Sequence, residues 1–201
     1  TGERIHGVAI ESVDLHSILD AFAPYFEKGQ IAYEAFVDGV AYGGRAYVEH
    51  PEAFGVPERT VAYVQSTRKP VDDILAFLAE HEEELDSLDI VAVNPVLYQE
   101  IEAQIPRITK AVYVTSAVSY RLEISHKESG KAAGLAYVLD LLGIAPEETI
   151  AFGDGDNDAE MLAFAGFGVA MENATEKCKA AADAVCDRCE NDGVARFLYG
   201  F

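Results

Sequence analysis

A regular alternation of helical and extended segments after residue 130 restricts the fold of this chain more than any other feature. The first helix of the series carries an apolar stripe made of Leu135, Val138, Leu139 and Leu142, and Gly143 stops it. The segments that follow are a strand at "TIAF", a helix over 156–165, a strand at "GFGVAM", a helix over 175–182, a strand at "DAVC" and a helix over 192–198. This alternation predicts parallel strands packed against helices in an α/β layer.

The earlier part of the chain predicts a mostly antiparallel sheet with helices on one face. The predicted strands are rich in Val, Ile, Tyr and Ala and cover residues 5–10, 31–37, 40–43, 60–65, 88–93, 111–116 and 119–124. Two helices are predicted from apolar faces, one of Leu15, Ile18, Leu19, Phe22 and Phe26, and one of Val71, Ile74, Leu75 and Leu78 that Pro70 opens. The segment "VYVTSAVSYRLEI" reads as a hairpin that turns at Ser116–Ala117. We place the boundary between two domains after residue 121, which gives domains 1–121 and 122–201.

The loop after "TIAF" gathers acidic side chains at the point where ligands of open α/β sheets bind. The stretch "GDGDND", residues 153–158, contains Asp154, Asp156, Asn157 and Asp158. The carboxyl ends of parallel strands form a crevice for ligands, and glycines there permit a tight backbone. Carboxylates so close together repel one another unless a cation lies among them, and they are the hard oxygen ligands that Mg²⁺ or Ca²⁺ prefers.

Two simpler interpretations of this loop are weaker. Asp156 or Asn157 could cap the next helix, but capping accounts for one or two of the four polar residues. An EF-hand calcium loop would place Asp154, Asp156 and Asp158 at its first, third and fifth positions. That loop needs glycine where this chain has Ala159 and a bidentate glutamate where it has Ala165. It also needs a preceding helix, whereas the pattern predicts a strand.

The charge of the chain argues against nucleic acid and anionic membranes as partners. Its 201 residues contain 15 Lys and Arg against 35 Asp and Glu, so the formal net charge is −20. No apolar run reaches the roughly 18–20 residues that cross a bilayer, and the start "TGERIHGVAI" resembles neither a signal peptide nor a transit peptide. We therefore expect a cytoplasmic protein, in which an anionic ligand needs a local positive feature.

The three cysteines leave two interpretations open. Cys186 and Cys189 form a C-x-x-C pair, and Cys178 lies shortly before them. No fourth cysteine or histidine lies near at zinc-ligand spacing. Reduced thiols are the simpler interpretation, and a redox pair formed by Cys186 and Cys189 is the alternative.

The C-terminal part of the chain resembles the closing segment of the haloacid dehalogenase-like phosphatases, and most of all their Cof-like subgroup with a large α/β cap. The motifs that carry the resemblance are "GDGDND" followed by "AEML", then "AGFGVAMENATEKCKAAAD" and "NDGVARFL", with "YRLEISHKESGKAAGLAYVLDLLGIAPEETIAFGDG" upstream. The resemblance is strong over about residues 120–201, and over 1–119 it rests on cap-like organisation. It implies the C-terminal half of a Rossmann-like core over 122–201 and an α+β cap over 1–121.

The resemblance also implies roles for individual residues in a Mg²⁺-dependent phosphatase. Asp154 would be a direct Mg²⁺ ligand, and Asn157 would contact a phosphate oxygen. Lys131, which opens a helix upstream, would pair with the phosphate and with the nucleophilic carboxylate. Asp158 would orient Lys131 or a metal-bound water. The family usually has glycine after this lysine, where the chain has Ala132.

The nucleophile of the family has no counterpart that we recognise in the sequence. The resemblance implies a D-x-D motif at the end of the first core strand, but the only D-x-D sequences lie within "GDGDND". Three hypotheses follow: a partial copy of a phosphatase that is inactive alone, a non-catalytic remnant that binds metal, phosphate or a protein, and one half of a split enzyme. Without a neighbouring strand, "TIAF" would expose an edge through which the chain could form a homo-oligomer.

The resemblance implies a small phosphorylated metabolite as substrate, such as a sugar phosphate or a nucleotide-derived phosphate. Within the cap, Tyr42, Arg45 and Arg121 are candidates for contacts with the leaving group. Ordinary exposed or interface positions are the simpler interpretation of all three.

Overall fold

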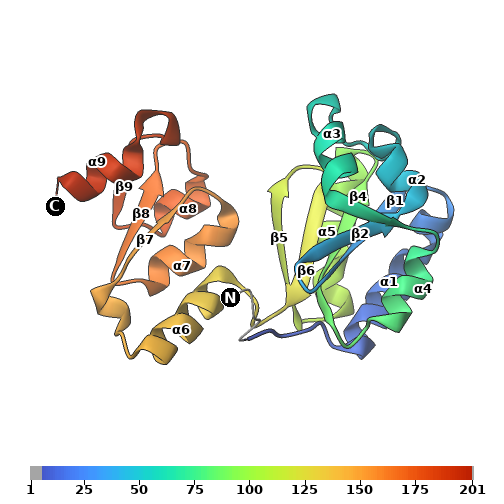
Figure 1. Ribbon diagram of the computed structural model, residues 1–201, viewed down its shortest axis with the longest axis horizontal. Helices are drawn as coiled ribbons and strands as arrows, with labels where there is room; N and C mark the ends of the chain where they lie inside the picture. The colour runs from blue at the N-terminus through green and yellow to red at the C-terminus, as the bar shows by residue number, and fades with distance from the viewer. Residues whose placement is uncertain (1–5, 201) are drawn as a thin grey trace. The chain divides into compact units, whose positions relative to one another are not determined.

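The computed structural model describes residues 6–200 and divides into two compact units, Thr1–Ser129 and Gly130–Phe201 (Figure 1). We call them the first unit and the second unit. The division falls after Ser129, whereas the sequence placed it after residue 121. Strand β6 (Arg121–His126) lies in the first unit because it pairs there with two other strands.

The first unit is built on a six-stranded sheet in the order β3-β2-β1-β4-β6-β5. Its elements before β6 are α1 (Ser12–Glu27), β1 (Ile31–Val37), β2 (Val40–Gly44), α2 (Arg45–Glu49), η1 (Pro51–Phe54), α3 (Glu58–Thr67), β3 (Arg68–Val71), α4 (Ile74–Glu80), β4 (Leu85–Ala92), α5 (Pro95–Ile108) and β5 (Val112–Val118). Neighbouring strands are antiparallel except for β2 and β3, which are parallel. The prediction of a mostly antiparallel sheet is therefore confirmed.

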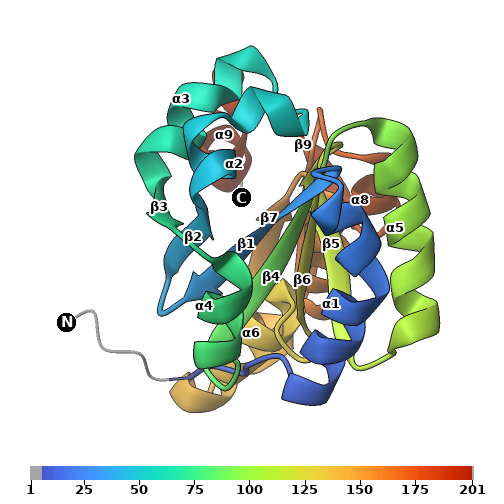
Figure 2. The same cartoon turned by 90° about the vertical axis from the view of Figure 1, so that its right-hand side faces the viewer.

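Helices α1, α4 and α5 cover one face of this sheet, and Figure 2 shows α1 and α5 side by side. Alternate strand residues point into the core beneath them, among them Tyr33, Leu88, Ile90 and Leu122, all nearly inaccessible to solvent. The opposite face is not bare, contrary to the prediction of helices on one face. Ala32 and Val91 pack there against residues of α2 and α3, in a second, smaller core.

Three local predictions in the first unit were wrong, two of them because tertiary packing or a side-chain hydrogen bond prevailed over local preference. Residues 60–65 belong to helix α3, which places Val61 and Val64 on one face toward the smaller core. Pro70 lies in strand β3, and α4 begins only at Ile74, where Asp73 caps it by accepting hydrogen bonds from two backbone N–H groups. Ile10 donates a backbone hydrogen bond to Leu85, but residues 6–10 form no strand, and residue 5 lies outside the described residues.

The hairpin formed by β5 and β6 turns at residues 119–120 and not at Ser116–Ala117. The register shifts between Thr115 and Val118, so β5 accommodates extra residues as a bulge. The hydroxyl of Ser116 donates to the carbonyl oxygens of Val118 and Arg121, at 2.6 and 3.0 Å. These bonds hold the bulge inside the strand and move the turn further along the chain.

The second unit is a three-stranded parallel sheet in the order β7-β8-β9, with helices between the strands, as the sequence predicted. Its elements are α6 (Lys131–Leu142), η2 (Pro146–Glu148), β7 (Ile150–Gly153), η3 (Asp156–Asp158), α7 (Ala159–Phe164), β8 (Phe167–Met171), α8 (Glu176–Ala180), β9 (Ala184–Cys186), η4 (Cys189–Asn191) and α9 (Gly193–Tyr199). Leu162, Val169 and Cys178 are buried at its centre.

Strand β7 lies at an edge of this parallel sheet and, within residues 6–200, pairs with β8 alone. Ile150 on β7 is 40% exposed, and Val138, Leu141 and Leu142 of helix α6 are also exposed. Of the apolar stripe predicted on α6, Val138 and Leu142 therefore face solvent, whereas Leu139 is buried and Leu135 packs against the core of the second unit. Across the described part of the chain, helices are too short or too polar to span a membrane.

Candidate functional site

The acidic loop begins where β7 ends, and two glycines let it fold tightly. A Cβ atom on Gly153 would lie 2.4 Å from the Cβ of Asp158, and one on Gly155 would lie 2.6 Å from Oδ1 of Asn157. Such distances are far inside normal contact, so neither position accepts a side chain without rearrangement. The glycines therefore allow the side chains of Asp158 and Asn157 to turn back beneath the loop that carries them.

Asp158 is the buried anchor of the loop, with 3% of its surface exposed. Its Oδ2 accepts hydrogen bonds from the backbone N–H groups of Asp154 and Gly155, each at 2.9 Å. Its Oδ1 accepts from Nζ of Lys131, which completes an ion pair. Burial alone would raise the pKa of Asp158, but the hydrogen bonds from Lys131 and the two N–H groups outweigh burial and lower that pKa. Asp158 is therefore a carboxylate whose charge is fully compensated within the fold.

Lys131 reaches this anchor from the first residue of helix α6, after Gly130 at the N-cap position. The side chain of Lys131 remains 48% exposed, so its ammonium group contacts Asp158 and solvent at the same time. The structure thus brings together two predicted site residues that are far apart in the sequence. Their arrangement leaves ammonium hydrogens available for a ligand beside the carboxyl end of β7.

Asp154 and Asn157 belong to the same loop and are exposed and half-buried respectively. Asp156 is exposed as well, and its Oδ1 accepts a 2.6 Å hydrogen bond from the hydroxyl of Thr175. The backbone N–H of Thr175 also donates to the carbonyl oxygen of Asp154, at 3.0 Å. Thr175 thus ties the loop to the start of α8.

Sequence reasoning missed Thr175. Its position before α8 marks it as a helix cap, and its hydroxyl does accept from the N–H of Cys178. Its contact with Asp156 depends on the neighbouring positions of β7 and β8 and has no local signal.

The two simpler interpretations of the loop do not account for its contacts. The segment runs from a strand into the 3-10 turn η3, which is not the helix-loop-helix arrangement of an EF-hand. The N-cap residues of η3 and α7, Gly155 and Asp158, make no capping hydrogen bond through their own side chains. Asp158 satisfies the backbone of the loop that precedes it and does not cap the helix that follows.

The donor set of the loop suits a metal ion that keeps much of its hydration shell. Residues 6–200 contain no group of three or more His, Cys, Asp or Glu side chains that could hold a metal. Asp154 nevertheless presents an exposed carboxylate, and Mg²⁺ commonly binds through one or two carboxylates together with water and phosphate oxygens. Asp154 therefore fits Mg²⁺ as one ligand among several.

The three cysteines are free thiols. Cys178 and Cys186 are buried, and burial raises the pKa of both thiols. Sγ of Cys186 lies 3.4 Å from Sδ of Met171, whereas Cys189 is exposed. A raised pKa disfavours the thiolate that redox exchange requires at Cys186.

The three candidate leaving-group contacts have different surroundings in the first unit. Tyr42 packs its ring on Phe77, with centroids 4.5 Å apart, and borders the main core. Arg45 forms a 2.8 Å ion pair with Asp72 at the surface. Arg121 alone lies in a mostly buried cluster of charged side chains.

The chain matches known proteins over most of its length. Residues 2–198 match the model of the haloacid dehalogenase-like hydrolases. The chain is 33% identical over 159 residues to a phosphoglycolate phosphatase of Methanopyrus kandleri, covering 78% of this chain and 68% of that protein. It is 49% identical over 77 residues to the 5-amino-6-(5-phospho-D-ribitylamino)uracil phosphatase YitU of Bacillus subtilis, covering 38% of this chain and 28% of that enzyme.

The fold is also similar to that of solved structures of haloacid dehalogenase-like hydrolases. A haloacid dehalogenase-like hydrolase from B. subtilis superposes with a TM-score of 0.73 at 25% identity, covering 96% of this chain and 72% of that structure. The family match extends through both units and includes the acidic loop and Lys131. The chain therefore belongs to the haloacid dehalogenase-like hydrolase family.

Proposed function

We propose that these residues form part of a Mg²⁺-dependent phosphatase that hydrolyses a small phosphorylated metabolite. The observation that carries the proposal is the ion pair of the half-exposed Lys131 with the buried Asp158, beside the exposed carboxylate of Asp154. A phosphate group placed there meets an ammonium group and a carboxylate suited to Mg²⁺. The two relatives described above, both phosphatases by name, support the same reaction class.

In this proposal each side chain has a separate task. Asp154 would hold Mg²⁺, which would neutralise charge on the phosphoryl oxygens. Asn157 would donate an amide hydrogen to a phosphate oxygen, and Lys131 would bind another while Asp158 keeps its ammonium group in place. Phosphoryl transfer depends mostly on such positioning and charge compensation. The second unit would be part of the catalytic core and the first unit its cap.

The proposal includes a limit on the chain by itself. The sequence contains no recognised D-x-D motif outside the acidic loop, so we propose that the nucleophilic aspartate is not among these residues. The chain alone would then bind Mg²⁺ weakly and release no phosphate. The two relatives are named for different phosphorylated compounds, so they support a small phosphorylated metabolite as substrate without selecting one. Among small phosphorylated metabolites, we propose a sugar phosphate.

The test compares phosphate release by two proteins, the 201-residue chain and the same chain preceded by a strand that carries a D-x-D motif. With millimolar Mg²⁺ and a panel of phosphomonoesters, we expect turnover only from the longer protein. Lys131→Ala should abolish that turnover, because it removes the ammonium group at the phosphate. Lys127→Ala is the matched control, an exposed lysine in the preceding loop.

Two outcomes would decide against the proposal. Full activity of the Lys131→Ala protein would remove this residue from the site. A longer protein that binds inorganic phosphate near 154–158 but hydrolyses no ester would favour the alternative of a non-catalytic binding remnant.

A further inference from the structure

A cavity of about 350 Å³ lies in the first unit, at the end of its sheet where β1 begins. At this end Ile31 pairs with Ala92. The chain enters and leaves the unit at the opposite end of the sheet, where the backbone of Ile10 bonds to Leu85 and β6 ends at His126. The volume falls within the roughly 300–1,000 Å³ of small-molecule sites. The cavity is therefore a feature of the first unit by itself, remote from the connection to the second unit.

Two pairs of aromatic rings line this cavity. Phe26 at the end of α1 stacks on Tyr33 of β1, with ring centroids 5.0 Å apart. Tyr47 of α2 and Phe54 of η1 meet edge to face, with centroids 5.6 Å apart. The first pair belongs to the main core or packs against it, and the second pair has the same relationship to the smaller core on the other face of the sheet. The cavity therefore lies where the two cores meet, with rings from both in its lining.

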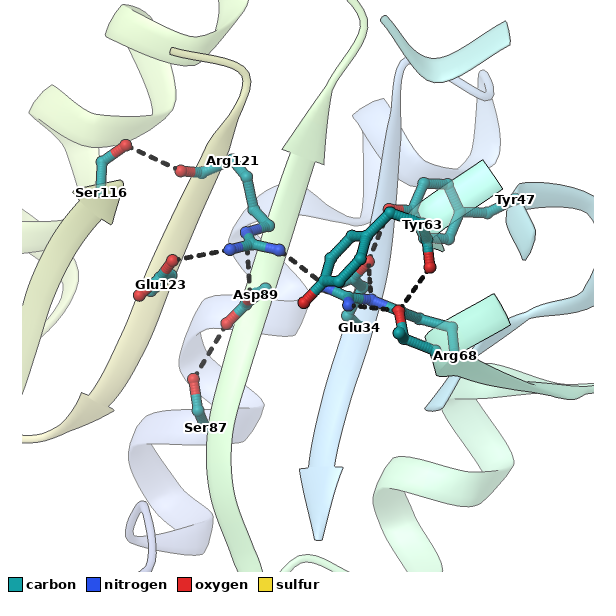
Figure 3. A network of polar contacts seen from close by, with 10 residues as sticks. Glu34, Tyr47, Tyr63, Arg68, Ser87, Asp89, Ser116, Arg121 and Glu123 are labelled. Atoms are coloured by element: carbon teal, nitrogen blue, oxygen red, sulfur yellow. Dashed lines mark hydrogen bonds and ion pairs between the residues drawn. The ribbon is translucent and has the colours of Figure 1, made fainter. Parts of the chain in front are cut away.

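The two tyrosines of the lining differ in the state of their hydroxyl groups. The hydroxyl of Tyr47 donates to Glu34 at 2.5 Å and is satisfied within the fold (Figure 3). Tyr33 is 1% exposed, and its hydroxyl oxygen is one of two buried side-chain polar atoms among residues 6–200 without a hydrogen-bond partner in the protein. Buried polar groups are normally paired, because an unpaired one costs free energy. Burial raises the pKa of Tyr33, so its hydroxyl stays protonated and can donate.

The charged residues of the lining are Arg45, Asp72 and Asp73, which leave one negative charge in excess. Arg45 is already paired, since its Nε donates to Asp72 at 2.8 Å and its Nη1 lies 3.6 Å from Glu49. Oδ1 of Asp73 accepts two backbone N–H groups at the start of α4, and a carboxylate can accept further bonds at its second oxygen. In a chain with a net charge of −20, this excess disfavours a phosphate or any other anion.

These properties together restrict the chemistry of a ligand. Aromatic walls favour a flat ring, which can stack on them with an offset or meet them edge to face. The buried donor of Tyr33 calls for an acceptor on the edge of that ring, and the exposed carboxylates of Asp72 and Asp73 call for N–H donors. A saturated sugar has no π face, and a plain aromatic hydrocarbon has neither acceptor nor donor.

We propose that this cavity binds a neutral or cationic nitrogen heterocycle that carries an amino group, the chemistry of adenine and cytosine. A ring nitrogen would accept from the hydroxyl of Tyr33, and the amino group would donate to Asp72 or Asp73. Because the hydroxyl is covered in the free protein, a neighbouring side chain has to shift to admit the ligand, as side chains commonly do on binding. No phosphoryl group takes part, so this binding is independent of the proposed phosphatase function.

The test measures binding of single compounds to the 201-residue chain by amide chemical shifts and calorimetry. The probes are adenine, cytosine and adenosine. Three comparison compounds each lack one required property: AMP is an anion, toluene is a ring without hydrogen-bonding groups, and putrescine is a cation without a ring. We expect saturable binding of at least one probe, with shifts at 31–33, 44–47 and 72–74, and weaker or no binding of the comparison compounds there.

Tyr33→Phe is the most informative variant, because it removes a hydroxyl that has no partner in the protein. It should leave the free energy of unfolding unchanged or raise it, yet weaken binding roughly tenfold, as expected for one lost hydrogen bond. Tyr199→Phe, the same change at a position that is 92% exposed, is the matched control and should change neither quantity. Asp72→Asn should also weaken binding severalfold, and Asp20→Asn, at an exposed position of α1, is its control.

Several outcomes would refute the site. They are no binding of any probe, shifts confined to other residues, equal affinity for toluene or AMP, and full affinity in both the Tyr33→Phe and Asp72→Asn proteins. If Tyr33→Phe prevents folding, Asp72→Asn carries the test, because this exposed carboxylate lies outside both cores. Lys131→Ala should leave binding of the probes unchanged, so failure of this site and failure of the proposed phosphatase activity are distinguishable.

Discussion

Asp89 makes the stability of the first unit depend on pH in a direction that can be stated in advance. Its pKa is raised from 3.8 to about 8, because burial and two neighbouring carboxylates disfavour its charged form. Between these values the native protein keeps a proton on Asp89 that the unfolded chain has released. The native state therefore binds more protons, and the free energy of unfolding falls as pH rises through this window.

The size of this pH effect follows from the difference between the two pKa values of Asp89, 3.8 and about 8. One pKa unit corresponds to about 1.4 kcal/mol, so this difference sets an upper bound of about 6 kcal/mol on the change in the free energy of unfolding. At the acidic end of this pH window, ordinary carboxyl groups also change the free energy of unfolding, so the contribution of Asp89 cannot be separated there. Between pH 6 and pH 8 we expect Asp89 to lower the free energy of unfolding by on the order of 2 kcal/mol.

The Asp89→Asn variant isolates this contribution. Its amide oxygen can still accept the 2.9 Å hydrogen bond that Ser87 donates to Oδ1, but it cannot ionise. Urea denaturation followed by circular dichroism at several pH values between 5 and 9 should show a flatter profile for the variant. Its advantage over the parent protein should grow as pH rises.

The control is Asp20→Asn, which removes an exposed carboxylate from α1 and should not change the pH profile. Parallel profiles for the parent and Asp89→Asn proteins would refute the reasoning. A parent protein that gains stability relative to Asp89→Asn as pH rises would refute it as well, since the sign would then be opposite.

Other parts of the structure give three more expectations. Gly153→Ala should lower the free energy of unfolding by about 1–3 kcal/mol, because the new Cβ collides with Asp158; a melting temperature equal to the parent's would contradict this. Leu162→Ala, at a fully buried position of the second unit, should cost about 2–5 kcal/mol in chemical denaturation, and a loss below 1 kcal/mol would mean that the core collapses around the gap. The exposed edge of β7 should make the chain self-associate in light scattering, and Ile150→Lys should restore the monomer mass without loss of helical signal; a parent chain that is already monomeric at high concentration would dismiss that edge as an interface.

The second unit could be predicted closely because its signals are local. Apolar periodicity and glycines such as Gly143, which has a positive φ at the end of α6, mark each helix and strand within a few residues. The contact between Lys131 and Asp158 is different, since nothing in either segment points to the other. It was anticipated only through resemblance to a known family, and the catalytic roles of both residues stay predictions.

In the first unit, the helix α3 and the contacts between charged side chains could not be predicted, because both depend on tertiary structure. Residues 60–65 carry the β-branched and aromatic residues typical of a strand, but they form part of helix α3, which packs Val61 and Val64 against the smaller core. The charged side chains around Arg121 depend on the register of β1, β4 and β6, which brings Glu34 opposite Asp89 and Asp89 opposite Glu123. Acidic residues within the three strands are visible in the sequence, one in β1, two in β4 and one in β6, but which of them are adjacent is a property of the pairing. Arg121 was therefore named as a candidate contact without its partners.

The bonds that hold Arg121 in place have a consequence for the speed and thermodynamics of recognition. Ser116 fixes the backbone of Arg121, and three acidic side chains surround its guanidinium group (Figure 3), so this long side chain has lost most of its rotamer freedom in the folded state. Arg121 lines a cavity of about 360 Å³. A ligand that enters this cavity does not have to immobilise the arginine, and an ordering cost of about 0.5–1.5 kcal/mol per flexible side chain is avoided. Association should then be a single fast step onto a preorganised surface, with little unfavourable conformational entropy from the protein.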